Sequence, residues 1–318
     1  MAIRRRPLYW GIFFVTAGAV MLLAQGNALD RDAVAAALAL WPVAIIVIGV
    51  ALLLRGTRLG LPGGMVAAAM PGLLLGGVVV AGPSMSIDCG TATVGNAQAR
   101  QGVFTGPATV RLNLACGDLT VTAVPGDAWH LETRDGTAAP TVNATGDRLS
   151  VESASQRHSF NFAHSGDAWL VSLPTAHRLD LDAEVSAGKG RFDLAGAQLG
   201  IVDLAVNAAE ARVDLTGATV GRVSLDVNAG AGWLQLPATG DLSGDLAVNA
   251  GKLSVCAPEG LGLRVRGDAS LGSIDHRGLI RNGGAWESPG YAFAQNHADL
   301  VVSANLGAID INPEGGCK

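Results

Sequence analysis

Aspartates recur at a fixed spacing in the second half of the chain, and their carboxylates are the side chains best suited to chemistry. Asp203 follows Asp182 by 21 residues, and Asp245 follows Asp203 by 42 residues, which is twice that interval. Carboxylates that converge on a groove could cleave an acidic polysaccharide, and a column of oxygen ligands could hold a hard cation such as calcium. A solvated surface is the simpler interpretation, because these acids follow a regular repeat as scaffold positions do.

Other catalytic and metal-binding patterns are missing from the sequence. The six histidines show no paired metal-ligand spacing. The 43 glycines form no P-loop or dinucleotide fingerprint, and no Gly-x-Ser-x-Gly elbow occurs. We therefore expect no catalytic residue, no metal and no cofactor. The protein is interpreted as non-enzymatic, with a polysaccharide-active β-helix enzyme as the minor alternative.

The aspartates belong to a wider repeat in which the same residue types return every 21 positions. Within each unit, apolar and polar residues alternate, which indicates strands with one buried face. Gly188, Gly230 and Gly251, with Ala209 in the second unit, mark a corner between two strands. The matching columns are Val185, Val206, Val227 and Val248, and Ala187, Ala208, Ala229 and Ala250.

A unit this short cannot bury its apolar face alone, so consecutive units should stack and share one interior. The sequence predicts an all-β domain that is a parallel β-solenoid of about 21-residue coils, with strict repeats over 179–258. Weaker matches to the repeat on both sides extend the expected stack to about 108–312. Irregular inserts are expected near 125–178 and 276–298, and Ala269-Ser270-Leu271-Gly272 falls one period beyond the strict block.

The alternation also predicts which polar residues face outward. Asn207, Asn228 and Asn249 should form a structural ladder, in which stacked amides bond to one another. Two further outward columns lie side by side, one of acids and one of arginines. We expect the arginines to neutralise the stacked negative charge of the acids. The acids are Asp193 and Asp214, and the arginines are Arg191 and Arg212.

Residues 1–83 differ in character from the repeats. Three apolar segments without charges, 8–24, 33–54 and 61–82, predict a transmembrane anchor of three helices, followed by a domain over 84–318. Pro42 and Pro71 interrupt the second and third segments, which membrane helices tolerate. A cleaved signal peptide is the alternative for the first segment, because Gly26-Asn27-Ala28 resembles a cleavage site.

Charge gives the expected orientation of this anchor. Arginines precede the first segment and separate the second from the third, so the positive-inside rule places the N-terminus in the cytoplasm and residues 83–318 outside it. The expected location is therefore a multi-pass protein of the cell membrane with an extracytoplasmic C-terminal domain. Residues 1–82 carry a net charge of +4 and the remainder −9, which argues against nucleic-acid binding.

All four cysteines, Cys89, Cys116, Cys256 and Cys317, follow the third apolar segment. An oxidising compartment permits disulfides there. Four cysteines allow three pairings, and we favour Cys89 with Cys116 and Cys256 with Cys317, because the C-terminal tail could then fasten the end of the stack. Free buried thiols are the alternative.

The N-terminal region resembles the LiaI-LiaF-like transmembrane region of bacterial envelope proteins over about residues 6 to 55. The resemblance is carried by Leu8-Tyr9-Trp10-Gly11-Ile12-Phe13, Gly18, and Leu40-Trp41-Pro42 leading into Ile45-Ile46-Val47-Ile48-Gly49. Relatives often have an even number of spans, whereas three are expected here. The repeats that follow are similar to toast-rack, or adhesin-type, β domains.

These resemblances imply a bacterial protein related to regulators of the cell-envelope stress response. The predicted function is regulation or sensing of envelope stress through protein contacts, with membrane lipid and a sensor kinase or other membrane protein as partners. An envelope polymer is another possible partner. The alternative is a structural or adhesive module that binds copies of itself, because the open edges of stacked coils favour association.

Overall fold

The computed structural model describes residues 11–16, 18–19, 49, 69–71, 73, 97–134, 139–153 and 166–314. Contacts between residues divide the chain into two compact units, Met1–Met85 and Ser86–Lys318.

The described residues of the first unit are helical. Thr16 donates from Oγ1 to the carbonyl oxygen of Ala69 over 3.3 Å, so the first and third apolar segments touch at this point. Most of the three expected spans, 8–24, 33–54 and 61–82, lies outside the described residues. Among the residues that are described, no helix combines the length and apolar character that crossing a bilayer requires.

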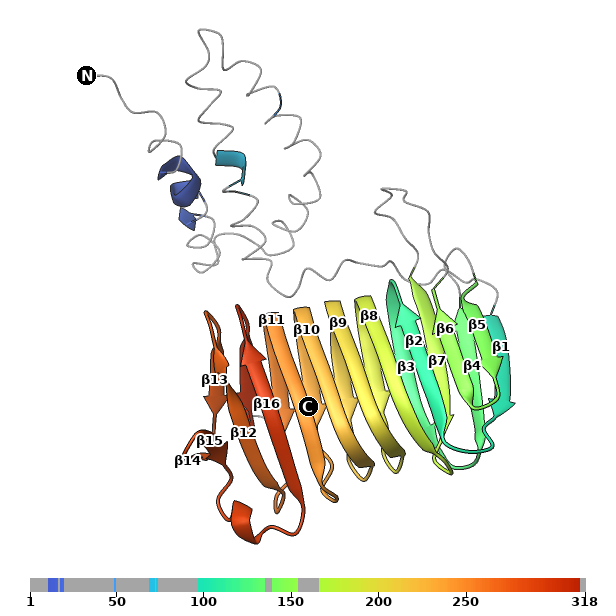
Figure 1. Cartoon of the computed structure of the whole chain (residues 1–318). Coiled ribbons are helices and arrows are strands. Elements are labelled where there is room, and N and C mark those ends of the chain that lie inside the picture. The colour runs from blue at the N-terminus through green and yellow to red at the C-terminus, as the bar shows by residue number, and fades with distance from the viewer. Residues whose placement is uncertain are drawn as a thin grey trace, which may run out of the picture. The chain divides into compact units, whose positions relative to one another are not determined.

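The second unit is built almost entirely of β-strands, which join into a single sheet (Figure 1). Among the described residues of this unit, one short 3-10 helix, η3 (Tyr291–Phe293), accompanies the strands. The strands described are β1 (Ala97–Val103), β2 (Ala108–Leu114), β3 (Gly117–Val124), β4 (Ala128–Arg134), β5 (Thr141–Thr145), β6 (Arg148–Glu152), β7 (Asp167–Pro174), β8 (Arg178–Asp193), β9 (Gln198–Asp214), β10 (Thr219–Gln235), β11 (Leu242–Cys256), β12 (Gly262–Ala269), β13 (Ser273–His276), β14 (Ile280–Asn282), β15 (Ala285–Glu287), β16 (His297–Ala304) and β17 (Ala308–Ile311).

The four central strands, β8 to β11, stack in parallel in the register that the period predicts. Val206 of β9 pairs with Val185 of β8 and with Val227 of β10, and Val227 pairs in turn with Val248 of β11. Each step between adjacent strands therefore advances the sequence by one repeat unit. Figure 1 shows these long strands side by side and bent over a common corner.

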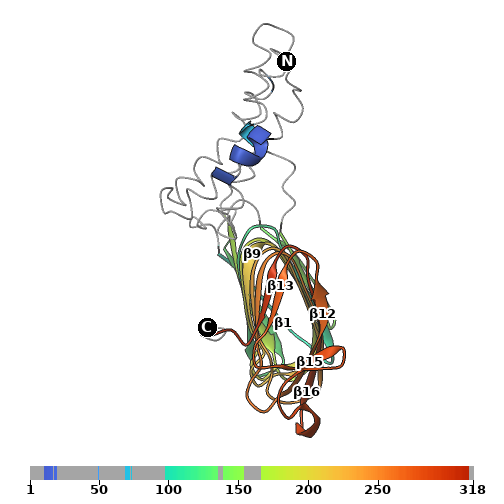
Figure 2. The same cartoon turned by 90° about the vertical axis from the view of Figure 1, so that its left-hand side faces the viewer.

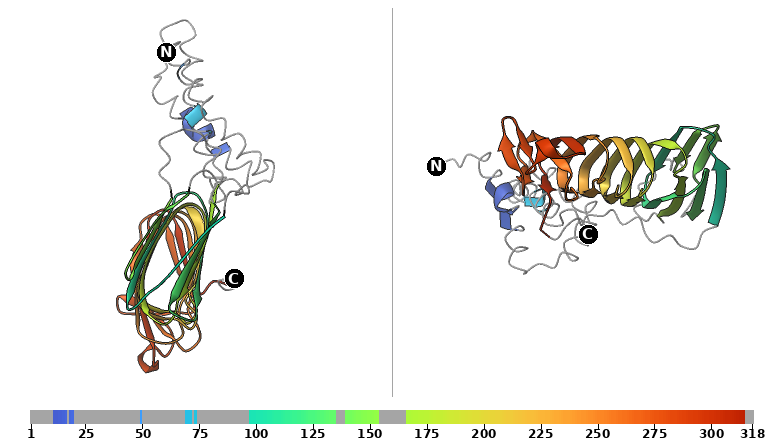
Figure 3. Two further views of the ribbon diagram at one scale, coloured as in Figure 1. Left: turned by 90° about the vertical axis from the view of Figure 1, so that its right-hand side faces the viewer. Right: turned by 90° about the horizontal axis from the view of Figure 1, so that it is seen from below.

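Each coil contributes alternate side chains to one continuous interior. Val206 and Leu204 are buried, whereas Asp203 between the inward positions 202 and 204 is exposed. Seen along the stack, the coils enclose a flattened space between two strand layers (Figure 3). Burial of this apolar interior is the main source of stability, and every coil depends on its neighbours for that burial.

The corner requires glycine where backbones of adjacent coils approach each other. Gly251 has a φ of 135°, and a Cβ added to it would lie 2.0 Å from the carbonyl oxygen of Gly230. Both the dihedral angle and the contact exclude a larger residue at this position. Glycine is thus required at position 251, whereas β9 holds Ala209 in the same column, where φ is not positive.

At its N-terminal end, the stack does not follow the order of the chain. The first coil, β2 with β3, pairs in parallel with β8 on one side. On its other side it pairs with β6 and β7, which come later in the sequence. The region 125–178, expected to be an irregular insert, therefore contains the outer coil of this end.

The C-terminal end repeats this arrangement. The last coil, β16 with β17, pairs with β11, and β12 with β13 pairs on its outer side. The sequence predicts Ala269-Ser270-Leu271-Gly272 one period beyond β11, but this segment belongs to a coil two layers away, because the last coil is inserted between them. Figure 2, which faces this end of the stack, shows β12, β13 and β15.

Antiparallel strands cover much of the N-terminal end and a short stretch of the C-terminal end. At the N-terminal end β4 pairs with β7, and β1 pairs with β4. At the C-terminal end β15 pairs with β12 and β14 pairs with β15. The domain is therefore parallel in its centre and mixed at its ends, unlike the uniformly parallel stack that the repeats predict.

Candidate binding surface

The halves of β8 to β11 that precede the corner at 188, 209, 230 and 251 form the first strand layer, and the halves that follow it form the second. The predicted aspartate column lies on the outer surface of the first strand layer. Asp182, Asp203, Ser224 and Asp245 occupy four successive coils, so that Ser224 interrupts the column of acids. Arg111 Nε lies 2.8 Å from Asp182 Oδ2, and Arg222 Nη2 lies 2.5 Å from Asp245 Oδ2. Arginines thus neutralise both ends of the column. Among the described residues, no three histidine, cysteine, aspartate or glutamate side chains gather into a metal-binding group.

Asp226 adds a further carboxylate beside this column. We call the surface formed by Asp182, Asp203, Asp226 and Asp245 the acidic surface. Partial burial raises the pKa of its carboxyl group, and the negative charges of Asp203 and Asp245 raise it further. The carboxylates of Asp203, Asp226 and Asp245 repel one another when charged, and Arg222, which lies against Asp245, offsets part of this repulsion.

The asparagine ladder is present and is longer than its three predicted members. Asn249 Nδ2 donates to Asn228 Oδ1 over 2.6 Å, and Asn228 Nδ2 donates to Asn207 Oδ1 over 2.7 Å. Asn305 from the inserted last coil extends the ladder by donating to Asn249 over 2.6 Å. At the other end, Asn207 Nδ2 donates to Glu184 Oε1 over 2.8 Å.

Glu184 sets the direction of the ladder, because a carboxylate only accepts hydrogen bonds. It accepts from Asn207 on one side and, over 3.2 Å, from Asn113 on the other. Every amide between Glu184 and Asn305 therefore donates toward this carboxylate. Sequence periodicity missed Glu184 and Asn113 because they stand outside the strict asparagine column.

Of the four cysteines, Cys116 and Cys256 are described, and each is disulfide-bonded. They lie four coil steps apart, about 19 Å at the usual strand spacing, whereas a disulfide needs Cα atoms within about 7 Å. They cannot bond to each other. Cys89 and Cys317 lie outside the described residues, so the proposed pairing of each stays a prediction.

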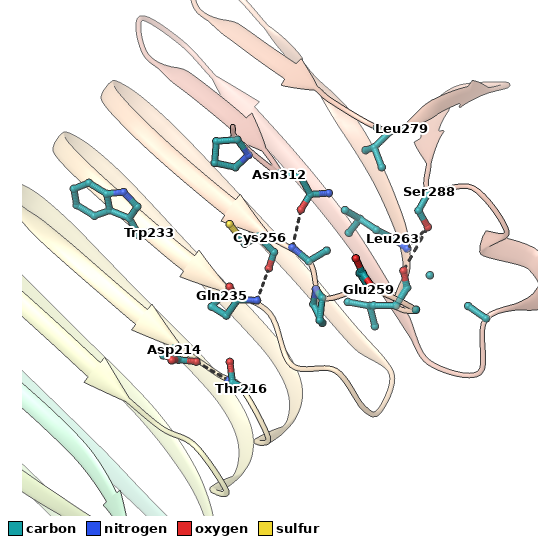
Figure 4. A pocket seen from close by; sticks show the side chains of 18 of the residues that line it. Asp214, Thr216, Trp233, Gln235, Cys256, Glu259, Leu263, Leu279, Ser288 and Asn312 are labelled. Carbon is teal, nitrogen blue, oxygen red and sulfur yellow. Dashed lines mark hydrogen bonds between the residues drawn. The ribbon is translucent and has the colours of Figure 1, made fainter. Parts of the chain in front are cut away.

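A groove of 1020 Å³ runs along the second strand layer toward the C-terminal end (Figure 4). It begins at Arg191 in β8 and ends among the loops around Ser288. Trp233, Gln235 and Cys256 lie along its course, as Figure 4 shows. The groove therefore crosses several coils at right angles to the strands.

The arginines of this groove lie in the same outward rows as the acids that they are predicted to neutralise, but they form no ion pair with them. Arg191 pairs with Arg212 in the strand register, and Arg212 pairs with Trp233. The guanidinium of Arg212 lies 4.6 Å from the centroid of the Trp233 ring. Within the described part of the chain, neither arginine has a carboxylate partner at ion-pair distance. The sequence prediction missed Trp233. Its place one repeat after Arg212 is the signal that Arg191, Arg212 and Trp233 share one column.

Hydrogen bonds hold several polar side chains of the groove in place. Asp214 Oδ1 accepts from the backbone N–H of Thr216 over 2.8 Å. Gln235 Nε2 donates to the carbonyl oxygen of Cys256 over 3.3 Å, and Asn312 Oδ1 accepts from the backbone N–H of Ala257 over 2.9 Å. These side chains are oriented before any ligand arrives, which lowers the entropic cost of binding.

A second cluster of polar side chains lies at the C-terminal end. Arg264 Nε bonds Glu287 Oε1 over 2.8 Å, and the guanidinium of Arg264 lies 4.1 Å from the Tyr291 ring centroid. Hydrogen bonds from Asn282 and Arg264 lower the pKa of the Glu287 carboxyl. The cluster fastens β15 and η3 to β12, and we assign it a structural role.

Comparison with known proteins finds a family that is similar to part of this domain. Residues 101–237 match the family described as the N-terminal domain of toast_rack, DUF2154. This range includes β2 to β10 and the acidic column as far as Ser224. No curated protein matches the chain.

Three solved structures align with 68% of this chain. A candidate cell adhesion protein from Clostridium sporogenes is 14% identical with a TM-score of 0.44, and 99% of that chain is covered. Candidate adhesins from Bacteroides fragilis and Parabacteroides distasonis are 13% and 10% identical, with TM-scores of 0.31 and 0.27, and 97% of each chain is covered. Residues 101–237 of the β domain are therefore similar to the N-terminal domain of toast_rack.

Proposed function

We propose that this protein is a non-enzymatic component of the bacterial cell envelope that regulates or senses envelope stress through contacts with another membrane protein. Residues 1–83 anchor it in the membrane, and residues 84–318 lie outside the cytoplasm. A sensor kinase is the proposed partner. The resemblance of residues 6 to 55 to the LiaI-LiaF-like region supports the anchor and the regulatory role.

The observation that carries this proposal is the fixed spacing of outward side chains across β8 to β11. Asp182, Asp203 and Asp245 project from one rigid surface at coil intervals. A surface of this kind suits recognition of a partner, because little conformational entropy is lost when it binds. The toast-rack match over residues 101–237 supports the same reading.

A structural or adhesive module that binds copies of itself is the alternative. Stacked coils would associate most readily through unpaired edges at the two ends. Here β4 covers an edge of β7, and β15 covers part of an edge of β12. These antiparallel strands interrupt the parallel pairing that end-to-end growth would continue, so the regulatory proposal is favoured.

Photo-crosslinking in cells distinguishes the two. A photoreactive amino acid replaces Asp203, which is exposed at the centre of the acidic surface. The proposal predicts a crosslink to a different membrane protein, with a sensor kinase among the products identified by mass spectrometry. The same substitution at Gln198, at the start of β9, is the control. Crosslinks only between copies of this chain would contradict the regulatory role.

A further inference from the structure

The groove on the second strand layer has the features of a ligand site. Its lining includes Arg191 and Trp233 from the central coils and Asn312 from the segment after β17. Four coil steps separate Arg191 from Asn312, which is about 19 Å at the usual strand spacing. A site this long suits an extended chain better than a compact molecule.

The charges of the groove exclude a strongly charged ligand. Among the described residues that line it, the charged ones are two arginines, Arg191 and Arg212, and three acids, Asp193, Asp214 and Glu259. A polyanion would meet the carboxylates, and a polycation would meet the guanidinium groups. The near balance favours an uncharged ligand that offers both donors and acceptors.

The fixed polar side chains leave complementary atoms for such a ligand. Asp214 binds Thr216 through Oδ1, which leaves Oδ2 as an acceptor. Gln235 uses Nε2 and retains Oε1, whereas Asn312 uses Oδ1 and retains the donor Nδ2. Hydroxyl groups can pair with either kind of atom, because each one donates and accepts.

Trp233 supplies the apolar part of the site. Its ring is partly exposed, and the guanidinium of Arg212 fixes its position. An indole ring presents a flat apolar surface with a polar N–H, which suits a molecule that is apolar on one face and hydroxylated at its edge. The pyranose ring of a sugar has this character.

We propose that this groove binds an uncharged glycan chain, with one sugar ring packed against Trp233 and hydroxyl groups bonded to Arg191, Asp214, Gln235 and Asn312. The inference rests on the proposed role of the domain as a binding surface of the cell envelope, and it assigns the groove a ligand separate from the protein partner of the acidic surface.

The test is isothermal titration calorimetry of the full chain in detergent micelles with two probes, a hexamer of glucose and a hexamer of N-acetylglucosamine. We expect at least one hexamer to bind. Trp233→Ala should weaken that binding about tenfold, which corresponds to about 1.4 kcal/mol. Trp233→Phe, which keeps an aromatic ring, should recover part of the loss. Arg191→Ala should also weaken binding.

The matched control is Arg222→Ala, which removes an exposed arginine that does not line the groove. It should leave hexamer binding unchanged. Far-UV circular dichroism establishes that each variant is folded, and Trp233 and Arg191 both point outward, so their loss spares the interior. Binding of neither hexamer to the unmodified chain, or equal binding by Trp233→Ala and Arg222→Ala, would overturn the proposal.

Failure of the glycan proposal is distinguishable from failure of the proposed function. Crosslinks from position 203 to a membrane protein, together with no hexamer binding, would remove only the groove assignment. Hexamer binding with crosslinks confined to copies of this chain would retain the groove and remove the regulatory role.

Discussion

Asn249 donates a hydrogen bond to Asn228 over 2.6 Å, although a full repeat separates the two residues in the sequence. Asn228→Ala removes this bond and the 2.7 Å bond from Asn228 to Asn207. We expect a loss of about 1 to 2 kcal/mol, because each intramolecular hydrogen bond contributes about 1 kcal/mol net. The midpoint of thermal unfolding should fall by several degrees. Gln198→Ala, also in an exposed strand position, is the control, and an equal effect of the two substitutions would show that the ladder adds no stability.

Gly251→Ala should destabilise the domain strongly. The new Cβ would lie 2.0 Å from the Gly230 carbonyl oxygen, and the φ of 135° disfavours any side chain. We expect a loss of about 3 kcal/mol or more, because two adjacent coils must separate. Gly240→Ala is the control, since its φ is 91° but no atom lies within 4 Å of the added Cβ. Denaturant unfolding should show a much larger change for Gly251→Ala, and equal changes would contradict the close approach at the corner.

Asp226 and Asp147 should affect stability with opposite signs. Burial and neighbouring acids raise the pKa of Asp226, so the folded state binds its proton more tightly than the unfolded chain does. Stability then falls as pH rises above the unfolded value of about 3.9. Asp226→Asn should therefore raise the unfolding temperature at neutral pH, and this gain should shrink as the pH falls toward that value.

Asp147 provides the matched comparison. A hydrogen bond from the backbone N–H of Thr105 lowers the pKa of its carboxyl group, so the charged form stabilises the fold above the unfolded value. Asp147→Asn should lower the unfolding temperature at neutral pH, and the difference should vanish as the pH falls through the lowered pKa. Shifts of the same sign for Asp226→Asn and Asp147→Asn would contradict these assignments.

The disulfide of Cys256 should contribute substantially to stability. With Cys317 as the proposed partner, it closes a loop of roughly 60 residues, worth about 4 kcal/mol in the chain-entropy account. Cys256→Ser should cause a loss of this size, and so should Cys317→Ser. Peptide mapping without reductant should find the 256 to 317 link. A link between Cys256 and Cys89 would refute the pairing.

The sequence predicts the centre of the fold well, because register there depends on residues that recur. Val206 pairs with Val185 and Val227 as the repeat requires. The ends could not be predicted in this way. Asn113 of the first coil pairs with Glu184, and Val248 pairs with Ala304 of the last coil. Neither sequence separation is a multiple of the repeat length, and these pairings arise from packing between distant segments.

The candidate site was only partly predictable for a related reason. The period places Asp182, Asp203 and Asp245 in one column, and the structure keeps them there. The period does not reveal that Arg212 stacks on Trp233 instead of pairing with an acid. Nor could it indicate that Asn312, which follows β17, lies beside β11, because this contact depends on the insertion of the last coil.

The central claim is that the β domain lies outside the cytoplasm as part of the cell envelope. Alkaline phosphatase, which is active only after export, and a green fluorescent protein that folds only in the cytoplasm can each be fused after Lys318 of the full chain. The account predicts high phosphatase activity and no fluorescence in intact bacteria. Fluorescent cells without phosphatase activity would contradict it.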